Sequence, residues 1–303
     1  MSAIEKNSRR CLRPLRDREF ELLTSFIRSE SGISLSSAKK ALVEGRLKRR
    51  LQNLGLQSYY DYYLLLGRDD GSERQQMLNL ITTNETSFFR EPAHFELIEK
   101  SLVPKWKRAA EDGRIDRHIR VWSAGCSTGE EPYSIAMCLH RALPEIEGWT
   151  FDIIASDIST KALEHAVRGI YPIDRASSIP VSHRDRFVLR GRGSQSGKIK
   201  IRRDLRDRIR FGRFNLNRRR YAFSESFDLI LCRNVLIYFG RDERMAVVNR
   251  FLDLLVDDGV LMLGHAESLQ GESDRVRCVF PTVYSLTGGR SRDAAPDRDE
   301  EIP

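Results

Sequence analysis

The chain has 303 residues, 40% of them hydrophobic, which is enough apolar material for one large or two ordinary domains. No stretch approaches the roughly 18 apolar residues of a membrane span, and residues 1–10 lack the apolar core of a secretory signal, so neither is expected. The net charge of +8 indicates an anionic partner such as nucleic acid, a membrane surface or an acidic protein, although a solvated basic surface is equally common.

Residues 16–66 show helical periodicity throughout. Apolar residues recur at helical spacing from Phe20 to Ile27 and again from Leu42 to Leu54, and a tyrosine-rich segment follows. We therefore expect a small all-helical N-terminal domain over residues 1–80. At 100° per residue, four basic side chains of its second helix fall within about a quarter turn. They are Lys39, Arg46, Arg49 and Arg50.

From Ile81 onwards, strand and helix patterns alternate. Helices are predicted near residues 131–143, 161–168 and 243–255. Strands that are apolar on both faces and alternate with helices indicate a mostly parallel sheet covered by helices on both sides, here over residues 81–287. The predicted strands are residues 120–123, 150–156, 209–214, 227–232 and 260–264.

One segment departs from this alternation. Residues 187–202 read as a strand, a Gly-rich turn and an alternating strand, which predicts a small antiparallel β-subdomain, about residues 186–212, inserted into the α/β domain. A surface hairpin without a function accounts for the pattern equally well. Residues 288–303 are rich in Gly, Pro and charge and are expected to form a disordered tail.

The five cysteines and six histidines form no ligand pattern. There is no C-x-x-C pair, no H-E-x-x-H and no His pair at i, i+4, so we expect reduced thiols, a cytoplasmic protein and no metal site. His94 and His265 are interpreted as packed or surface histidines.

The stretch from Val121 to Ser134 reads as a strand, a small-residue turn and the start of a helix, and it is compatible with two chemistries. A Gly-rich turn at this place is typical of a site for a nucleotide-like cofactor. Residues 125–129 also match G-x-S-x-G, the nucleophile elbow of serine hydrolases.

The hydrolase interpretation is disfavoured. Ser127 would need a downstream acid and a histidine, and Asp228 or Asp257 with His265 occur in that order. However, no H-G-G-G-type oxyanion loop precedes the turn, and the two glutamates after it would place negative charge where an oxyanion must develop.

A dinucleotide also fits poorly, because G-x-G-x-x-G is absent and Glu130 and Glu131 stand where a pyrophosphate should bind. A cationic, phosphate-free cofactor such as S-adenosylmethionine (SAM) suits these carboxylates better, although simple helix capping also explains them. Asp157, which ends the next strand, is placed either to bind ribose hydroxyls or to cap the following helix.

The polar pair Arg233-Asn234 follows the buried strand 227–232, at the carboxyl end where α/β proteins bind ligands. Methyltransferases that act on base amines carry an N-P-P-Y-type turn here. This chain has Asn234-Val235-Leu236-Ile237 without prolines, which argues against base methylation despite the basic charge.

Five motifs then occur in order: ITTNETSFFRE, WSAGCSTGEEPYSIA, ASDIS, CRNVLIYF and GHAES. Together they resemble the chemotaxis receptor glutamate methyltransferase family, CheR, from about residue 16 to 286. The resemblance implies a SAM-dependent methyltransferase with a Rossmann-like, mostly parallel α/β sheet, an inserted small antiparallel β-subdomain and a small all-helical N-terminal domain.

The resemblance also implies the reaction. The expected enzyme transfers a methyl group from SAM to glutamate side chains on the cytoplasmic helical domain of methyl-accepting chemotaxis receptors, giving methyl esters and S-adenosylhomocysteine. It would be a cytoplasmic protein recruited to membrane receptor arrays, without nucleic acid, metal or membrane insertion. Catalytic roles are expected for Arg90 and Tyr238. Cofactor contacts are expected at Asn84, Thr86, Arg90, Glu131, Asp157, Asn215, Leu216, Arg233 and Asn234.

Substrate docking is expected at the basic arc of Lys39, Arg46, Arg49 and Arg50, which would attract an acidic receptor helix. Some family members capture a receptor C-terminal peptide on the β-subdomain by strand addition, and whether this chain does so is left open. A SAM-binding sensor without catalysis and a nucleic-acid methyltransferase remain alternative classes. The presence of Arg90 and Tyr238 argues against the first, and the missing N-P-P-Y turn argues against the second.

Overall fold

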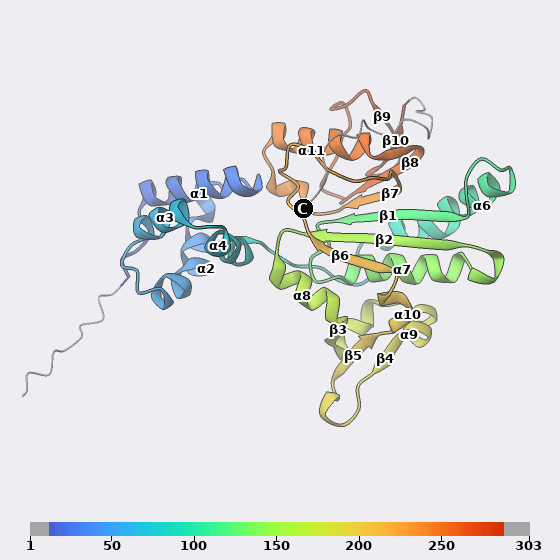
Figure 1. The fold of residues 1–303 in the computed structure, drawn as a ribbon, viewed down its shortest axis with the longest axis horizontal. Helices are drawn as coiled ribbons and strands as arrows, with labels where there is room; N and C mark the ends of the chain where they lie inside the picture. Colours follow the sequence, from blue (N-terminus) through green and yellow to red (C-terminus); the bar gives the residue numbers. More distant parts are fainter. Residues whose placement is uncertain (1–11, 288–303) are drawn as a thin grey trace, which may run out of the picture. The chain divides into compact units, whose positions relative to one another are not determined.

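The structure, a computed structural model, describes residues 12–287, which form two compact units that divide between Thr83 and Asn84 (Figure 1). The predicted tail, residues 288–303, lies outside the described residues. Within residues 12–287, no helix combines the length and the apolar character needed to cross a bilayer.

The first unit is all-helical, as predicted. Its core consists of fully buried side chains that recur at helical spacing, such as Leu23 and Ile27 on the first helix and Leu47 and Leu51 on the second. The sequence pattern did not predict the fourth helix. The elements are α1 (Asp17–Ser31), the 3₁₀ turn η1 (Ser37–Lys39), α2 (Lys40–Asn53), α3 (Tyr59–Arg68) and α4 (Ser72–Ile81).

The second unit is built on a seven-stranded sheet in the order β6-β2-β1-β7-β8-β10-β9. The first five strands of this order are parallel, whereas β10 and β9 pair in antiparallel fashion at one end. The mostly parallel α/β fold is thus confirmed. The strands are β1 (His118–Ala124), β2 (Thr150–Asp157), β6 (Ile209–Arg213), β7 (Phe227–Cys232), β8 (Leu255–Leu263), β9 (Val276–Phe280) and β10 (Val283–Leu286).

Helices cover both faces of this sheet because adjacent residues of a strand point to opposite sides. Val121 of β1 joins a core cluster with Leu139 of α7, whereas its neighbour Trp122 joins a second cluster with Phe251 of α11 (Figure 1). The helices are α5 (Pro92–Leu97), α6 (Val103–Glu111), α7 (Glu130–Ala142), α8 (Thr160–Arg168), α9 (Val181–Phe187), α10 (Arg203–Arg206) and α11 (Arg241–Asp253). Shorter turns are the π turn η2 (Ile98–Leu102) and the 3₁₀ turns η3 (Glu145–Glu147), η4 (Ile173–Ser178), η5 (Gly193–Gln195) and η6 (Leu236–Tyr238).

The inserted antiparallel sheet is present, but its predicted bounds need correction. It has three strands in the order β3-β5-β4, namely β3 (Ile170–Pro172), β4 (Val188–Arg190) and β5 (Lys198–Ile201). The range 186–212 missed β3, which is too short to show alternation. It also included most of β6, which instead pairs in parallel with β2 in the main sheet.

Candidate functional site

The carboxyl ends of the five parallel strands meet at one edge of the sheet, where α/β folds place their ligands. After β1 the chain makes a tight turn in which Gly125, Ser127 and Gly129 all have positive φ angles, of 83°, 51° and 96°. A Cβ atom at Gly125 would lie 2.4 Å from a methyl group of Val235, and one at Gly129 would lie 2.8 Å from the Cβ of Ala166. Glycine is therefore required at both places for conformational and steric reasons.

Asp157 organises this turn from the end of β2. Its two carboxylate oxygens accept hydrogen bonds from the backbone N–H groups of Ser127 and Ser159, each at 2.8 Å. The N-cap of α8 is Ser159, whose hydroxyl accepts from the N–H of Ala162 at 3.2 Å, so Asp157 is not the helix cap. Burial raises the pKa of Asp157, and the two backbone N–H bonds oppose that shift.

The same contacts argue against the hydrolase interpretation. The Ser127 hydroxyl donates to the carbonyl oxygen of Asn84 at 2.9 Å, rather than to a histidine. Asp228 accepts the backbone N–H of Arg120, near the amino end of β1, and Asp257 lies near the amino end of β8. Both acids are thus at the opposite end of their strands from the turn.

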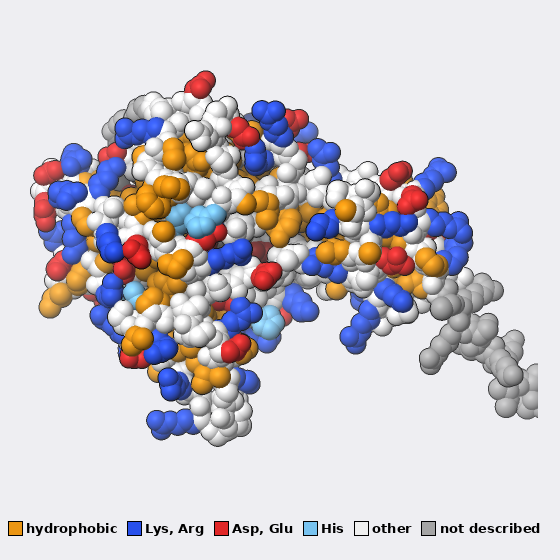
Figure 2. Space-filling view, turned by 180° about the vertical axis from the view of Figure 1, so that it is seen from behind, with side chains coloured by type: hydrophobic (Ala, Val, Ile, Leu, Met, Phe, Trp, Pro, Cys, Tyr) orange, Lys and Arg blue, Asp and Glu red, His pale blue; other side chains and the backbone are white. Residues whose placement is uncertain are grey.

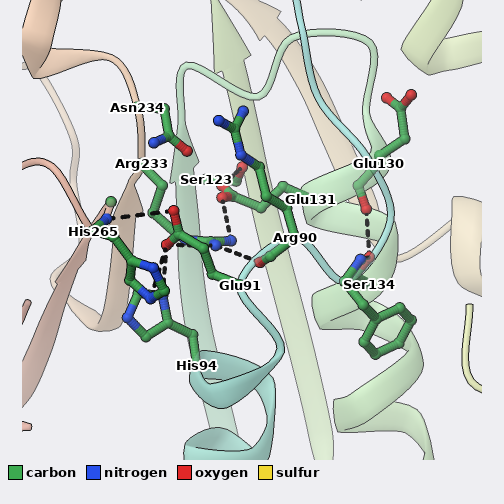
Figure 3. A network of polar contacts seen from close by, with 12 residues as sticks. Arg90, Glu91, His94, Ser123, Glu130, Glu131, Ser134, Arg233, Asn234 and His265 are labelled. Atoms are coloured by element: carbon green, nitrogen blue, oxygen red, sulfur yellow. Dashed lines mark hydrogen bonds and ion pairs between the residues drawn. The ribbon is translucent and has the colours of Figure 1, made fainter. Parts of the chain in front are cut away.

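The two glutamates at the start of α7 take different directions (Figure 3). Glu131 accepts from the Ser123 hydroxyl at 2.7 Å and pairs with Arg233 Nη1 at 3.2 Å. Glu130 is almost fully buried and accepts from the Thr128 hydroxyl at 2.6 Å. Of the two, therefore, Glu131 joins the polar cluster at the strand ends.

Arg233, directly after β7, is the centre of that cluster. Its guanidinium pairs with Glu91 Oε2 at 2.9 Å, donates to the backbone carbonyl of Arg90, and lies 5.5 Å from the ring centroid of Phe95. Only 2% of the Arg233 side chain is exposed, so it functions as an internal clamp between the Phe88–Glu91 segment, α7 and the end of β7.

Burial and the charge of Arg233 together shift the pKa values of the neighbouring groups. Burial raises the pKa of Glu131, and the charge of Arg233 opposes this. At Glu91 burial acts in the same upward direction, but the charge and hydrogen bond of Arg233 outweigh it and lower the pKa. Burial, reinforced by Arg233, lowers the pKa of His94 to about 4, so this histidine is neutral near pH 7.

Glu267 performs a similar task for the loop that carries Asn234 and Tyr238. Its buried carboxylate accepts the backbone N–H groups of Asn234 at 2.8 Å, Gly264 at 2.7 Å and Ile237 at 3.2 Å. Asn234 has a positive φ of 59°, a conformation that asparagine tolerates. The loop then forms η6, which ends at Tyr238.

The remaining expected contacts lie around the same edge. Asn84 is tied to the turn through Ser127, and the carbonyl of Thr86 accepts from Arg175 at 2.7 Å. Arg90 donates to the carbonyl of Glu85 at 3.1 Å, and in Figure 3 its guanidinium extends away from the Glu91–Arg233 pair. Asn215 and Leu216 follow β6, whose last residue pairs with Asp157. The docking arginines and Lys39 belong to the first unit.

Two residues of the polar cluster at the strand ends, Glu91 and Glu267, were not predicted as site residues from the sequence. Both stand inside motifs that were noted, F-F-R-E and G-H-A-E-S, but an isolated glutamate gives no sign of burial. The available signals were the position of Glu267 shortly after a predicted strand and a glycine, and that of Glu91 directly before the proline that begins a helix.

The described residues contain two groups with metal-ligand chemistry, Glu91 with His94 and His265, and Glu99 with Cys138 and His183. In both groups an arginine already pairs with the carboxylate, Arg233 at 2.9 Å from Glu91 and Arg141 at 2.8 Å from Glu99. These groups are therefore described as ion-pair networks, and the absence of a metal stays a prediction.

The residues at the edge fit SAM. Glu91 and Glu131 pair with one buried guanidinium, that of Arg233, and Asp157 adds a third carboxylate at the same edge, so the inner site is net negative when these groups are ionised. Such a site favours a cationic ligand and opposes a pyrophosphate. The turn after β1 requires glycine at two positions, and the missing side chains let a ligand approach the backbone closely.

Comparison with known proteins gives a consistent result over both units. Residues 84–285 match the family described as "CheR methyltransferase, SAM binding domain", and residues 18–82 match "CheR methyltransferase, all-alpha domain". The chain is 40% identical to "Chemotaxis protein methyltransferase 2" of Pseudomonas aeruginosa, covering 84% of this chain and 88% of that protein. It is 38% identical to "Chemotaxis protein methyltransferase" of Escherichia coli, covering 90% of this chain and 92% of that protein.

Proposed function

The chain belongs to the CheR methyltransferase family, and on that premise we propose that it methylates glutamate side chains of methyl-accepting chemotaxis receptors. Its activity class is SAM-dependent methylation in chemotaxis. The products would be glutamate methyl esters and S-adenosylhomocysteine. The observation that carries the proposal is the net negative inner site at the strand ends, built from the motifs that characterise the family resemblance.

In this proposal, residues from several segments around the carboxyl ends of the strands hold the cofactor. Asp157 would bind the ribose hydroxyls, Glu131 would lie near the amino group, and the turn at Ser127 would lie against the cofactor backbone. Bound SAM would supply a methyl group on a sulfonium, to which the glutamate oxygen bonds as the methyl–sulfur bond breaks and S-adenosylhomocysteine leaves. The other expected cofactor contacts are Asn84, Thr86, Arg90, Asn215, Leu216, Arg233 and Asn234.

The acceptor needs alignment more than activation. A glutamate carboxylate has a pKa near 4.3 in water and is ionised near pH 7, so it needs no general base. The protein's contribution is to hold the carboxylate in line with the bond that breaks. Arg90, whose guanidinium extends away from the buried clamp, would hold the acceptor or the cofactor, and Tyr238 would orient the acceptor.

The direct test is transfer of label from tritiated SAM to receptor-containing membranes. We expect a base-labile product, because a methyl ester hydrolyses in alkali and releases volatile methanol. Base-stable label would contradict esterification. SAM binding without any transfer would indicate a sensor, and label in added nucleic acid would indicate a nucleic-acid methyltransferase.

The roles of Arg90 and Tyr238 are tested with the same assay. With saturating SAM we expect Arg90→Ala and Tyr238→Phe to lower turnover by roughly 10- to 100-fold, a range typical of lost alignment. Ile237→Ala, a change at an exposed neighbour, serves as the control. Normal turnover in both variants would contradict the assignment.

Two features outside the site are proposed for substrate docking. Lys39, at the end of η1 directly before α2, and Arg49 on α2 are exposed, whereas Arg46 and Arg50 have partners within the first unit. The exposed pair is therefore the part of the basic arc proposed to attract an acidic receptor helix. The three-stranded sheet is proposed as a strand-addition site for a receptor C-terminal peptide, to be tested by pull-down with such peptides.

We also propose that the protein acts in the cytoplasm at membrane receptor arrays, because its acceptor would be there. Co-sedimentation with receptor-containing membranes, compared with membranes that lack receptors, tests this. Equal sedimentation with both would contradict it.

A further inference from the structure

The second unit carries a cluster of arginines between β6 and β7. We call residues 213–221 the arginine loop. Its four arginines, Arg213, Arg218, Arg219 and Arg220, are all exposed, and no acidic residue occurs from 213 to 224. Within residues 12–287 none of the four forms an ion pair. On the face drawn in Figure 2, basic side chains are interspersed with acidic ones.

The loop begins at the same sheet edge as the cofactor site. Arg213 is opposite Asp157 in the parallel pairing of β6 with β2, and the N–H of Phe214 donates to the Asp157 carbonyl at 3.0 Å. Leu216, an expected cofactor contact, is inside the loop. Along the sequence, the four arginines are therefore two to four residues from Leu216.

The loop is held in one conformation by its own contacts. The Tyr221 hydroxyl donates to the Leu216 carbonyl at 2.6 Å, and Arg250 of α11 donates to the same carbonyl at 3.0 Å. The N–H of Asn217 donates to Asn215 Oδ1 at 2.9 Å. A surface that is ordered before binding loses less entropy on association.

We propose that the arginine loop is a docking surface for the acidic helical segment that surrounds the target glutamate. The inference rests on the proposed function and names the part of the second unit that meets the acceptor. The inner site is net negative, which suits a cationic cofactor but repels a glutamate that approaches from solvent. A basic rim beside it offsets that repulsion and attracts the acidic segment.

A nucleic acid fits this surface less well. Proteins that bind single strands combine basic side chains with exposed aromatic rings on which bases stack. Here the rings near the arginines are used internally, because Phe214, Tyr221 and Phe223 all pack against Trp122, with ring centroids 4.7–5.7 Å away. The loop thus offers charge without a stacking platform.

The test compares three full-length variants. The first is R218E/R219E/R220E. The second, R218K/R219K/R220K, keeps the charge. The third, R18E/R108E/R277E, makes the same change of net charge at exposed arginines elsewhere. For each variant we would measure SAM affinity, kcat and KM for a soluble receptor cytoplasmic fragment, and binding of a fluorescent 20-residue Glu-rich helical peptide by anisotropy.

We expect the glutamate variant of the loop to raise KM for the receptor fragment, and to weaken peptide binding, by about tenfold at low salt. SAM affinity should be unchanged, the lysine variant should stay near wild type, and the control should change little. The difference should vanish at about 1 M salt, where the Debye length is near 3 Å.

An unchanged KM, an equal loss in the control, or a loss of SAM affinity in the loop variant would overturn the proposal. So would tighter binding of a labelled RNA or DNA oligonucleotide that depends on the same arginines. Peptide binding needs no turnover. If wild type fails to methylate receptors but the loop still binds the acidic peptide, the proposed reaction fails while the surface stands.

Discussion

Single buried carboxylates determine much of the geometry at the strand ends. Glu267 holds three backbone N–H groups, those of Asn234, Gly264 and Ile237, with one carboxylate. Three N–H groups need two acceptor oxygens, and glutamine has one, so Glu267→Gln must break at least one bond and turn an amide group toward a donor.

We expect Glu267→Gln to weaken SAM binding by about tenfold and to destabilise the fold by roughly 1–3 kcal/mol, the range for an unsatisfied buried donor. Isothermal titration and urea unfolding measure the two effects. Glu272→Gln, at a partly exposed carboxylate that pairs with Arg244, is the matched control and should leave SAM binding intact. If both variants lose affinity equally, Glu267 has no specific positioning role.

His94 makes the stability of the second unit sensitive to acid. Its pKa is lowered from 6.5 to about 4, because burial and Arg233 disfavour its charged form. Between these two pKa values the unfolded chain binds more protons than the folded one. The contribution of neutral His94 to stability is therefore fully present above about pH 6.5, and it is lost as the pH falls toward 4. The shift corresponds to at most about 3 kcal/mol.

We therefore expect the wild type to lose more stability between pH 7 and pH 4 than His94→Gln, measured by urea unfolding at each pH. His165→Gln, at an exposed position, is the control and should follow the wild type. Parallel pH profiles for the wild type and His94→Gln would contradict the role assigned to His94.

At the scale of elements, the sequence predicted those parts that carry strong periodicity. The strand–turn–helix unit around β1 and α7 was located to within two residues, because a buried strand, a Gly-rich turn and an acidic first helical turn coincide there. The strands β3, β9 and β10 were not predicted. β3 and β10 have only three and four residues, too few to show a clear pattern, and β9 is an exposed edge strand.

The position of the site could be predicted from the sequence, but the contacts between its side chains could not. Residues that follow strands, such as Asp157 and Arg233, were placed correctly at one edge by the parallel topology alone. The side-chain contacts could not be predicted in the same way. Arg233 pairs with both Glu91 and Glu131, and Glu130 points in another direction. These contacts depend on side-chain packing, which the spacing of residues in the sequence does not encode.

Helix α2 shows how two neighbouring arginines differ. Arg50 pairs with Glu73, a buried carboxylate that also accepts from the Tyr62 hydroxyl at 2.8 Å, whereas Arg49 is exposed. Removing Arg50 leaves a buried charge unpaired, which costs about 3 kcal/mol or more.

We expect Arg50→Ala to lower the unfolding free energy by about 3 kcal/mol, and Arg49→Ala to change it by less than about 0.5 kcal/mol. Urea unfolding of the full chain compares the two variants directly. Equal effects would mean that the Arg50–Glu73 pair adds no stability. This difference also makes Lys39 and Arg49, rather than Arg46 and Arg50, the residues to reverse in a docking experiment.

For the whole molecule, we propose that the buried acidic groups bind a cationic cofactor and that the exposed basic groups attract an acidic substrate. The buried centre of the second unit is rich in acidic groups, with Glu91 and Glu131 paired to the guanidinium of Arg233 and Asp157 bonded to the turn beside them, and suits a cationic cofactor. The surplus of 51 basic over 43 acidic residues is carried by exposed groups such as the arginine loop and α2. Net charge alone indicated an anionic partner, and the distribution of charge separates the two proposed roles.

The two units allow these functions to be tested apart. Both hydrophobic clusters of the second unit are formed by its own residues, from Phe88 to Tyr284. A chain of residues 84–303 should therefore fold cooperatively and bind SAM about as tightly as the full protein, since every expected cofactor contact is at or after Asn84. It should methylate receptor fragments more slowly, because Lys39 and Arg49 are absent.

The full-length variant K39E/R49E provides the matched comparison. If charge on α2 is what the fragment lacks, this variant should show a similar rise in KM for the receptor, with SAM affinity unchanged. A fragment that folds but cannot bind SAM would show that the first unit contributes to the cofactor site. A fragment as active as the full chain on receptors would remove α2 from the docking proposal and leave the arginine loop as the basic surface to explain substrate attraction.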